Sequence, residues 1–458
     1  MNNTKFAREL KSLICYVRQY GIEHISFKIN SIEAFPKEQE QLEEFLIQVH
    51  KGFFMAQDRV IYLLKKVLLE QKELKKTMSQ VRCRHEKDKE QEVKQSLNNV
   101  RYQERVLRKI IDSLAWQIFN YDLTTLRRLY YGQELIDITD SNLESEISFT
   151  KNYVRDNPEA FVLISDLTSF IQIGDIVTFS KDKGAEIYEL KEGPVNCKIF
   201  EVLGEFAENQ CPKYLQLRLE DENESFRKHF ERNIKQLSRI NQVSETISKG
   251  YGTDLLTGQK VRIHQDEIVL DTYTDIVNKL LNDCNKKGYS ISVIEGCLLI
   301  GVYDVRKCPS CVFDAWAKEE QIEAPIYDIR ESFYDPLSFP IFLHSFSDTS
   351  IVDIILGKKV IKMTIDLKKW LNTFENDGCK VRWMSRKETA RINANMKGSN
   401  KIFDINGQGI ELEKNEMSMQ IGTGIFSRMF TSFNTPLSIK KLLMTTYSAA
   451  EEFEGFED

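Results

Sequence analysis

Proline is absent from residues 38 to 134, and only Gly52 and Gly132 interrupt this stretch with glycine. Because proline breaks the interior of a helix and glycine weakens it, such a stretch can form long uninterrupted helices. Apolar residues recur there in two sets with steps of seven: Val60, Val67, Leu74 and Val81, then Val93, Val100, Leu107 and Leu114. Between the sets lies the polar segment RCRHEKDKEQE. The pattern predicts two long antiparallel helices joined by a turn, within an N-terminal helical region over residues 1–135.

The apolar stripe of these helices has two interpretations. A seven-residue repeat is typical of a coiled coil, in which case the helices would join two copies of the chain as a homodimer. The stripe would equally suit an ordinary helical subdomain that packs against the rest of the same chain. So few repeats do not set an oligomeric state, and both interpretations stay open.

The composition is that of a globular protein, with 41% hydrophobic and 29% charged residues, and 458 residues exceed one ordinary domain. The net charge of -6 means that any affinity for nucleic acid must come from local basic patches. No apolar run reaches the roughly 18 residues that a membrane span requires. The nine cysteines are scattered, which suggests reduced thiols. We therefore expect a cytoplasmic protein with no membrane partner.

Short β-rich runs begin at about residue 161. The segments FIQIGDIVTFS, AEIYELK, CKIFEVLG and YLQLRLE are each expected to form a strand. Asp182-Lys183-Gly184 lies between the first two and has the composition of a hairpin turn. A helix is then expected over residues 222–248, followed by a glycine cap at Gly250.

The remainder of the chain alternates between helical and strand patterns. We expect a helix over residues 272–287, paired strands in YSISVIEG and CLLIGVYDV, and a further mixed stretch in IVDIILGKKVIKMTIDLKKWLNTF. The predicted fold class is mixed α/β (α+β), with an N-terminal helical hairpin region, a central α/β core and a C-terminal mixed α/β domain. The role of that last domain, residues 256–458, is not indicated by its sequence.

The segment GDIVTFSKDKGAEIYELKEG, residues 174–193, contains the side chains best suited to chemistry. Asp175 lies on the first strand of the expected hairpin and Glu189 near the end of the second, so the turn would bring the two carboxylates together. Lys191 is two residues beyond Glu189, and alternate residues of a strand point to the same face. Carboxylate oxygens bind Mg²⁺ or Mn²⁺, and an ammonium can position a water molecule or a phosphate. Together these groups have the chemistry of phosphodiester hydrolysis.

Gly-Asp on one strand, followed by Glu-x-Lys on its hairpin partner, resembles the signature of the PD-(D/E)xK nuclease superfamily. The resemblance extends from near residue 140 to 250 and implies a restriction-endonuclease-like core over residues 136–255. Gly174 stands where many members have a proline. The resemblance implies a magnesium-dependent nuclease in which Asp175, Glu189 and Lys191 are the catalytic residues.

The same resemblance assigns binding roles around the core. The expected metal ligands are Asp175, Glu189, the backbone carbonyl of Leu190, and either Glu144 or Glu146 from a preceding helix. The expected nucleic-acid contacts are Lys235, Gln236 and Arg239 on the following helix. Apart from the resemblance, Arg127 and Arg128 are basic residues just before the core, and their position there makes them further expected contacts.

We therefore expect hydrolysis of nucleic acid, with DNA favoured over RNA. A role in defence against phage is an analogy from the fold alone. Several alternatives stay open: a half-exposed hairpin whose charged residues are merely solvated, a nuclease fold that has lost its activity, and a non-catalytic scaffold that binds nucleic acid. A further alternative is a sensor whose C-terminal domain binds a protein partner.

Overall fold

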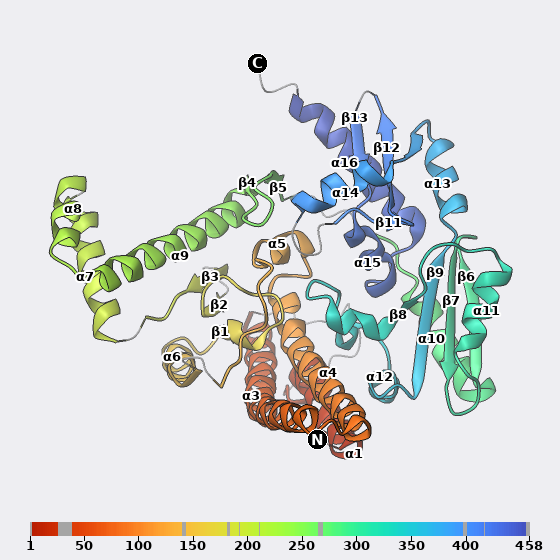
Figure 1. Ribbon diagram of the computed structural model, residues 1–458, viewed down its shortest axis with the longest axis horizontal. Coiled ribbons are helices and arrows are strands. Elements are labelled where there is room, and N and C mark those ends of the chain that lie inside the picture. The colour runs from red at the N-terminus through yellow and green to blue at the C-terminus, as the bar shows by residue number, and fades with distance from the viewer. Residues whose placement is uncertain are drawn as a thin grey trace. The chain divides into compact units, whose positions relative to one another are not determined.

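The computed structural model describes residues 2–25, 39–139, 143–180, 184–191, 193–209, 211–263, 269–396, 401–415 and 417–454 (Figure 1). The chain divides into two compact units, each drawn from separate parts of the sequence. The first unit comprises residues 1–24, 52–113 and 266–458, and the second comprises residues 25–51 and 114–265. Both long N-terminal helices contribute residues to each unit, so the units cut across the three consecutive parts expected from the sequence.

The predicted hairpin of long helices is confirmed by α3 (Gln39–Cys83) and α4 (Lys87–Ile118). In the first unit, Gln71 Nε2 of α3 donates to Glu104 Oε2 of α4 at 2.7 Å. Residues of the seven-residue stripe are buried there: Val60, Val67, Val81, Val100 and Leu107. The stripe is thus covered within a single chain, as expected for a packed subdomain, and the homodimer stays a prediction.

The first unit also contains α1 (Asn3–Arg18), α2 (Tyr20–Glu23) and the C-terminal part of the chain. Its C-terminal helices are α10 (Thr274–Lys287), α11 (Cys311–Glu319), α12 (Asp348–Ile355), α13 (Leu367–Glu375), α14 (Arg386–Asn395), α15 (Thr423–Thr431) and α16 (Pro436–Glu454), with the 3-10 helices η3 (Ile329–Tyr334) and η4 (Ile341–Leu343). Its strands are β6 (Tyr289–Ile294), β7 (Leu298–Asp304), β8 (Tyr327–Asp328), β9 (Lys359–Ile365), β10 (Lys380–Trp383), β11 (Asp404–Ile405), β12 (Gln408–Lys414) and β13 (Met417–Gln420).

Two antiparallel sheets organise these strands. One has the order β6-β7-β9-β8, and in the other β12 pairs with β10, β11 and β13 (Figure 1). β7 is buried along its whole length because it is a central strand of an apolar sequence. The helix and paired strands predicted over residues 272–304 are confirmed by α10, β6 and β7. The buried ammonium of Lys109 in α4 donates to the carbonyls of Pro336 (2.9 Å) and Ser338 (3.3 Å), which ties the hairpin to this unit.

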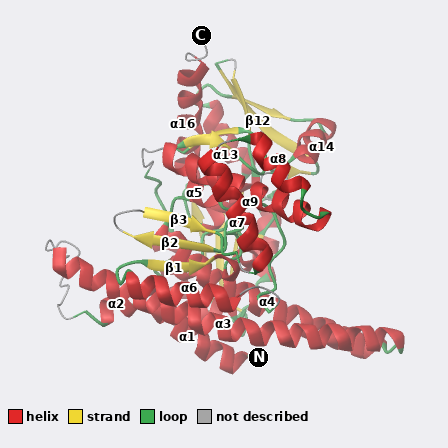
Figure 2. Ribbon diagram, turned by 90° about the vertical axis from the view of Figure 1, so that its left-hand side faces the viewer, coloured by secondary structure: helices red, strands yellow, loops and turns green. Residues whose placement is uncertain are grey.

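The second unit holds the segment with the predicted catalytic residues. Its helices are α5 (Leu123–Arg128), α6 (Leu143–Asp156), the 3-10 helix η2 (Ser165–Leu167), α7 (Pro194–Asn209), α8 (Pro212–Glu220) and α9 (Glu224–Lys249). Its strands are β1 (Phe161–Ile164), β2 (Ile176–Ser180), β3 (Gly184–Tyr188), β4 (Tyr251–Thr253) and β5 (Lys260–Arg262). The first three form an antiparallel sheet in the order β1-β2-β3, with α6 packed beside β1 (Figure 2).

Two segments expected as strands are helices. CKIFEVLG lies in α7 and YLQLRLE lies in α8, so the strand prediction is wrong for both. The spacing of Ile199, Val202 and Leu203 is i, i+3, i+4, which places the three side chains on one helical face. That face packs on Phe226 and Phe230 of α9, which buries it. The apolar content of these segments thus reflects helix packing rather than strand pairing.

The helix expected after these segments is confirmed by α9. It ends at Gly250, which has the left-handed φ of 75° that a glycine cap requires. The Asp182 and Lys183 positions of the expected hairpin turn lie outside the described residues, while β2 and β3 on either side pair as predicted.

The elements together make a mixed α/β fold, as expected. Within the described part of the chain, no helix has the length and apolar character needed to cross a bilayer. All nine cysteines are free thiols.

Candidate functional site

Acidic residues gather at one end of the sheet β1-β2-β3. Asp175 immediately precedes β2, and its backbone joins both neighbouring strands. Its N–H donates to the carbonyl of Tyr188 at 2.8 Å, and its carbonyl accepts from Ser165 N at 2.9 Å. Glu189 directly follows β3, so it lies next to Asp175 at the same end of the sheet. The antiparallel register therefore brings together residues that are far apart in the sequence.

Gly174 allows the chain to enter β2 in this position. Its φ of 75° is in the left-handed region, which glycine adopts readily. A Cβ atom there would collide with the side chain of Ile187 and lie 2.9 Å from the carbonyl of Tyr188. Proline has a φ of about -65° and could not replace it. The backbone of this turn therefore requires glycine at position 174.

Lys191 links β3 to α9. Its Nζ donates to Glu189 Oε1 at 2.6 Å and to Gln236 Oε1 at 2.8 Å. The amide N–H of Leu190 donates to Asp175 Oδ2 at 2.7 Å. The side chains of Lys191 and Glu189 are only 14% and 8% exposed. The structure thus places the three predicted catalytic residues and Gln236 in one half-buried group, and it ties Leu190 to Asp175 through its N–H.

Glu146 of α6 faces the same group. It is only 3% exposed, and its Oε2 has no hydrogen-bond partner among the described residues. Burial, and then the nearby carboxylates of Asp166 and Asp175, raise its pKa to about 8. Glu144 on the same helix is exposed. Of the two acidic residues left open by the sequence, Glu146 is the one that lies near Asp175.

The carboxylate of Asp175 is also affected by its neighbours. Burial, and then the charge of Glu189, raise its pKa to about 6, although the Leu190 N–H and the charge of Lys191 act in the opposite direction. Asp166 in η2 contributes a further negative charge. Asp166 was not among the residues predicted from the sequence, where its one signal is a position two residues after the buried strand β1. Crowded carboxylates in a partly buried site are a common property of functional sites.

The predicted nucleic-acid contacts are placed differently from one another. Lys235 is exposed on α9, and Arg239, one turn further on, has its guanidinium 4.7 Å from the ring centre of Tyr131. Arg127 is half-buried. Arg128 is buried, and its Nη1 forms an ion pair with Asp254 Oδ2 at 2.6 Å. A buried, paired guanidinium is not accessible to a phosphate, so the placement of Arg128 gives it a structural role.

The fit of a divalent cation can be judged from the donor atoms. Within the described ranges, no three or more His, Cys, Asp and Glu side chains are arranged to hold a metal as they stand. Asp175 and Glu189 instead accept from Leu190 N and the Lys191 ammonium. The buried Oε2 of Glu146, however, lacks any partner among the described residues, and burying such a group is unfavourable. Oxygen donors of this kind suit Mg²⁺ or Mn²⁺, so the donor chemistry of Glu146, Asp175 and Glu189 fits such an ion.

Comparisons bearing on this site were made with known protein families, curated proteins and solved structures. None of the three found a match to this chain.

Proposed function

We propose that the chain is a metal-dependent nuclease that hydrolyses phosphodiester bonds, of DNA in preference to RNA. The observation that carries the proposal is the position of Lys191, whose ammonium is held beside Glu189 and Gln236 at the end of the sheet where Asp175 lies. An ordinary solvated hairpin would not bury these charges together. The order of elements around them also fits the resemblance to the PD-(D/E)xK superfamily.

In this proposal each side chain has a distinct task. Asp175, Glu189 and Glu146 would hold Mg²⁺ or Mn²⁺, which when bound supplies charge relief at the phosphate and lowers the pKa of a water molecule. Lys191 keeps a positive charge beside the reacting phosphate and donates hydrogen bonds to it or to the attacking water. Gln236 fixes the lysine by accepting from its ammonium. The backbone carbonyl of Leu190 remains a proposed additional ligand.

The nucleic acid would approach along α9. Lys235 is exposed there, and Arg239 lies on Tyr131, a pair that could meet a phosphate and a base. Lys235 and Arg239 are basic residues in a chain of net charge -6, so the positive charge that they offer to a nucleic acid is local. A function in defence against phage, as a DNA-cutting effector, is part of the proposal only by analogy.

The test is incubation of the purified chain with supercoiled plasmid, linear DNA and RNA, each with Mg²⁺, Mn²⁺ or a chelator. The Asp175→Ala and Lys191→Ala variants are run in parallel, with Lys151→Ala, an exposed lysine on α6, as the matched control. We expect metal-dependent cutting that the first two variants lose and the control keeps. Binding of nucleic acid with no cutting under any metal would favour the non-catalytic scaffold instead, and capture of a protein by the C-terminal region would favour the sensor.

A further inference from the structure

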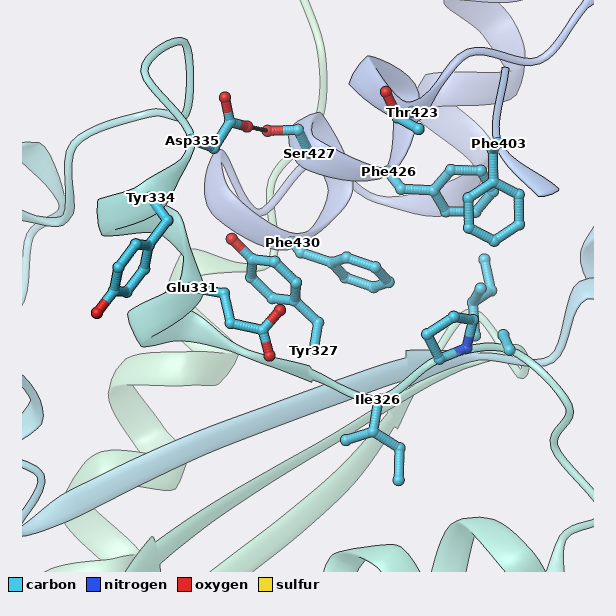
Figure 3. Close-up of a pocket in the computed structure, with 13 residues that line it drawn as sticks. Ile326, Tyr327, Glu331, Tyr334, Asp335, Phe403, Thr423, Phe426, Ser427 and Phe430 are labelled. Carbon is cyan, nitrogen blue, oxygen red and sulfur yellow. Dashed lines mark hydrogen bonds between the residues drawn. The ribbon is translucent and has the colours of Figure 1, made fainter. Parts of the chain in front are cut away.

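A second candidate site lies in the first unit, where a cavity of about 580 Å³ opens among β8, η3 and α15 (Figure 3). Pockets that hold small organic ligands have volumes of about 300 to 1,000 Å³. None of the proposed nuclease residues lines this cavity. An occupant would therefore serve a purpose separate from phosphodiester hydrolysis.

Aromatic rings form much of the cavity wall. Tyr327 and Phe430 stack with their ring centres 5.3 Å apart and their planes at 19°. Phe403 and Phe426 stack at 3.8 Å and 29° toward the other end (Figure 3). Phe426 and Phe430 come from the same face of α15, four residues apart, so the helix presents both rings to one side. The wall offers flat apolar surfaces with electron-rich faces.

The charged groups that line the cavity are all acidic. Glu331 and Asp335 contribute carboxylates, and no lysine, arginine or histidine is among the lining residues, all of which are described. Asp335 Oδ2 accepts from Ser427 Oγ at 3.0 Å, as Figure 3 shows. Glu331 is exposed at the cavity wall, and its Oε1 accepts a hydrogen bond of 3.2 Å from Asp328 N as part of the capping box that begins η3. The guanidinium of the neighbouring Arg330 is paired with Asp328, its Nη2 donating to Asp328 Oδ2 at 2.6 Å.

We propose that this cavity binds an organic cation, in which an ammonium or guanidinium group is attached to an apolar or aromatic body. The rings would cover the apolar body and attract the cation through their faces. Glu331 would supply the opposite charge through a charge-assisted hydrogen bond. An anionic ligand would meet two carboxylates and no base, so the lining excludes that class.

The first experiment varies only the charge of the ligand. Tryptamine, its neutral analogue tryptophol and the anion indole-3-acetate are titrated into the full chain by isothermal titration calorimetry. We expect tryptamine to bind about tenfold more tightly than tryptophol, as one charge-assisted contact predicts, and indole-3-acetate not to bind. Equal or tighter binding of tryptophol or indole-3-acetate would overturn the proposal, as would no binding of tryptamine at ~1 mM.

The second experiment varies the charge of the protein. Glu331→Gln keeps an oxygen that can accept from Asp328 N and removes the negative charge. Glu319→Gln, an exposed residue of α11 outside the cavity, is the matched control. We expect the affinity for tryptamine to fall about tenfold in the first variant only, with that for tryptophol unchanged. Unchanged tryptamine binding by Glu331→Gln, in protein with an unaltered thermal melt, would remove the carboxylate from the site.

Discussion

The ammonium nitrogen of Lys191 lies 2.6 Å from Oε1 of Glu189, and the two side chains are 14% and 8% exposed. A buried carboxylate without a counter-charge is strongly unfavourable, so this lysine stabilises the acidic end of the sheet. The same placement keeps a positive charge beside the proposed metal ligands. Structural and chemical roles therefore coincide in one side chain, and they can be separated by experiment.

Lys191→Met should strongly reduce cleavage in a protein that still folds but melts at a lower temperature, because methionine keeps much of the aliphatic stem but leaves the Glu189 carboxylate without its ammonium partner. We expect a loss of at least about 100-fold in kcat, the usual size for a positioned proton-transfer or charge-stabilising group. A cleavage time course and a thermal melt on the same sample measure both effects. Cutting at the wild-type rate would take the lysine out of the mechanism.

Gln236→Ala should lower kcat about tenfold with little change in KM, because the glutamine acts through Lys191 rather than on the substrate. Gln242→Ala is the matched control on the same helix, since Gln242 bonds to the carbonyl of Thr253 instead. Steady-state rates for both variants provide the comparison. A change in KM alone would indicate that Gln236 contacts nucleic acid directly.

Glu146→Gln should weaken binding of Mn²⁺ by at least about tenfold, the size expected for a supporting or direct metal contact. Glu144→Gln, on the exposed side of the same helix, should leave binding unchanged. Electron paramagnetic resonance of free Mn²⁺ measures the affinity without requiring activity. If both variants bind alike, the buried carboxylate lies outside the metal site.

The metal-free protein should lose stability as the pH rises from about 4.5 to about 8. The pKa of Glu146 is raised to about 8 in the folded chain, so the folded state binds this proton more tightly than the unfolded state. Its contribution is present below the unfolded pKa and is lost as the pH rises through the folded pKa. Asp175, whose pKa is raised to about 6, also loses its contribution to stability as the pH rises, over a lower pH range.

Ionisation of Glu146 should lower the free energy of unfolding by on the order of 2 kcal/mol, after allowance for solvent screening. Denaturant melts of the wild type and Glu146→Gln at several pH values, all with chelator, measure it. The variant should show a flatter profile between pH 6 and 8. Parallel profiles would mean that the carboxylate ionises as freely as in the unfolded chain.

Arg128→Ala should destabilise the second unit by about 3 to 5 kcal/mol, because it leaves the buried Asp254 carboxylate without its cationic partner. Hydrogen exchange measures this loss of stability.

Lys235→Ala should not change stability and should instead weaken nucleic-acid binding, with a smaller dependence on salt. Binding at two salt concentrations measures the change in affinity. A salt-dependent binding defect in Arg128→Ala, at full stability, would return this residue to the interface.

The sequence indicated that Asp175, Glu189 and Lys191 would lie together, whereas it predicted two of the surrounding helices as strands. Asp175 directly precedes β2, and Glu189 and Lys191 follow β3, so one turn between two paired strands was enough to place them together. The segment after them was misread because a short apolar run such as CKIFEVLG cannot be assigned to a strand or a helix from its apolar content alone. Asp166 could not be found from spacing, because only the pairing of β1 with β2 brings it near Asp175.

The backbone at Gly174 bears on how relatives of this chain could be recognised. Its left-handed φ and its contact with Ile187 exclude every larger residue, proline included. A search pattern that demands proline before the aspartate would pass over any sequence that shares this turn. Relatives that share this turn should instead be sought by a glycine at this position, a short β-hairpin after it, and an acidic residue on the preceding helix.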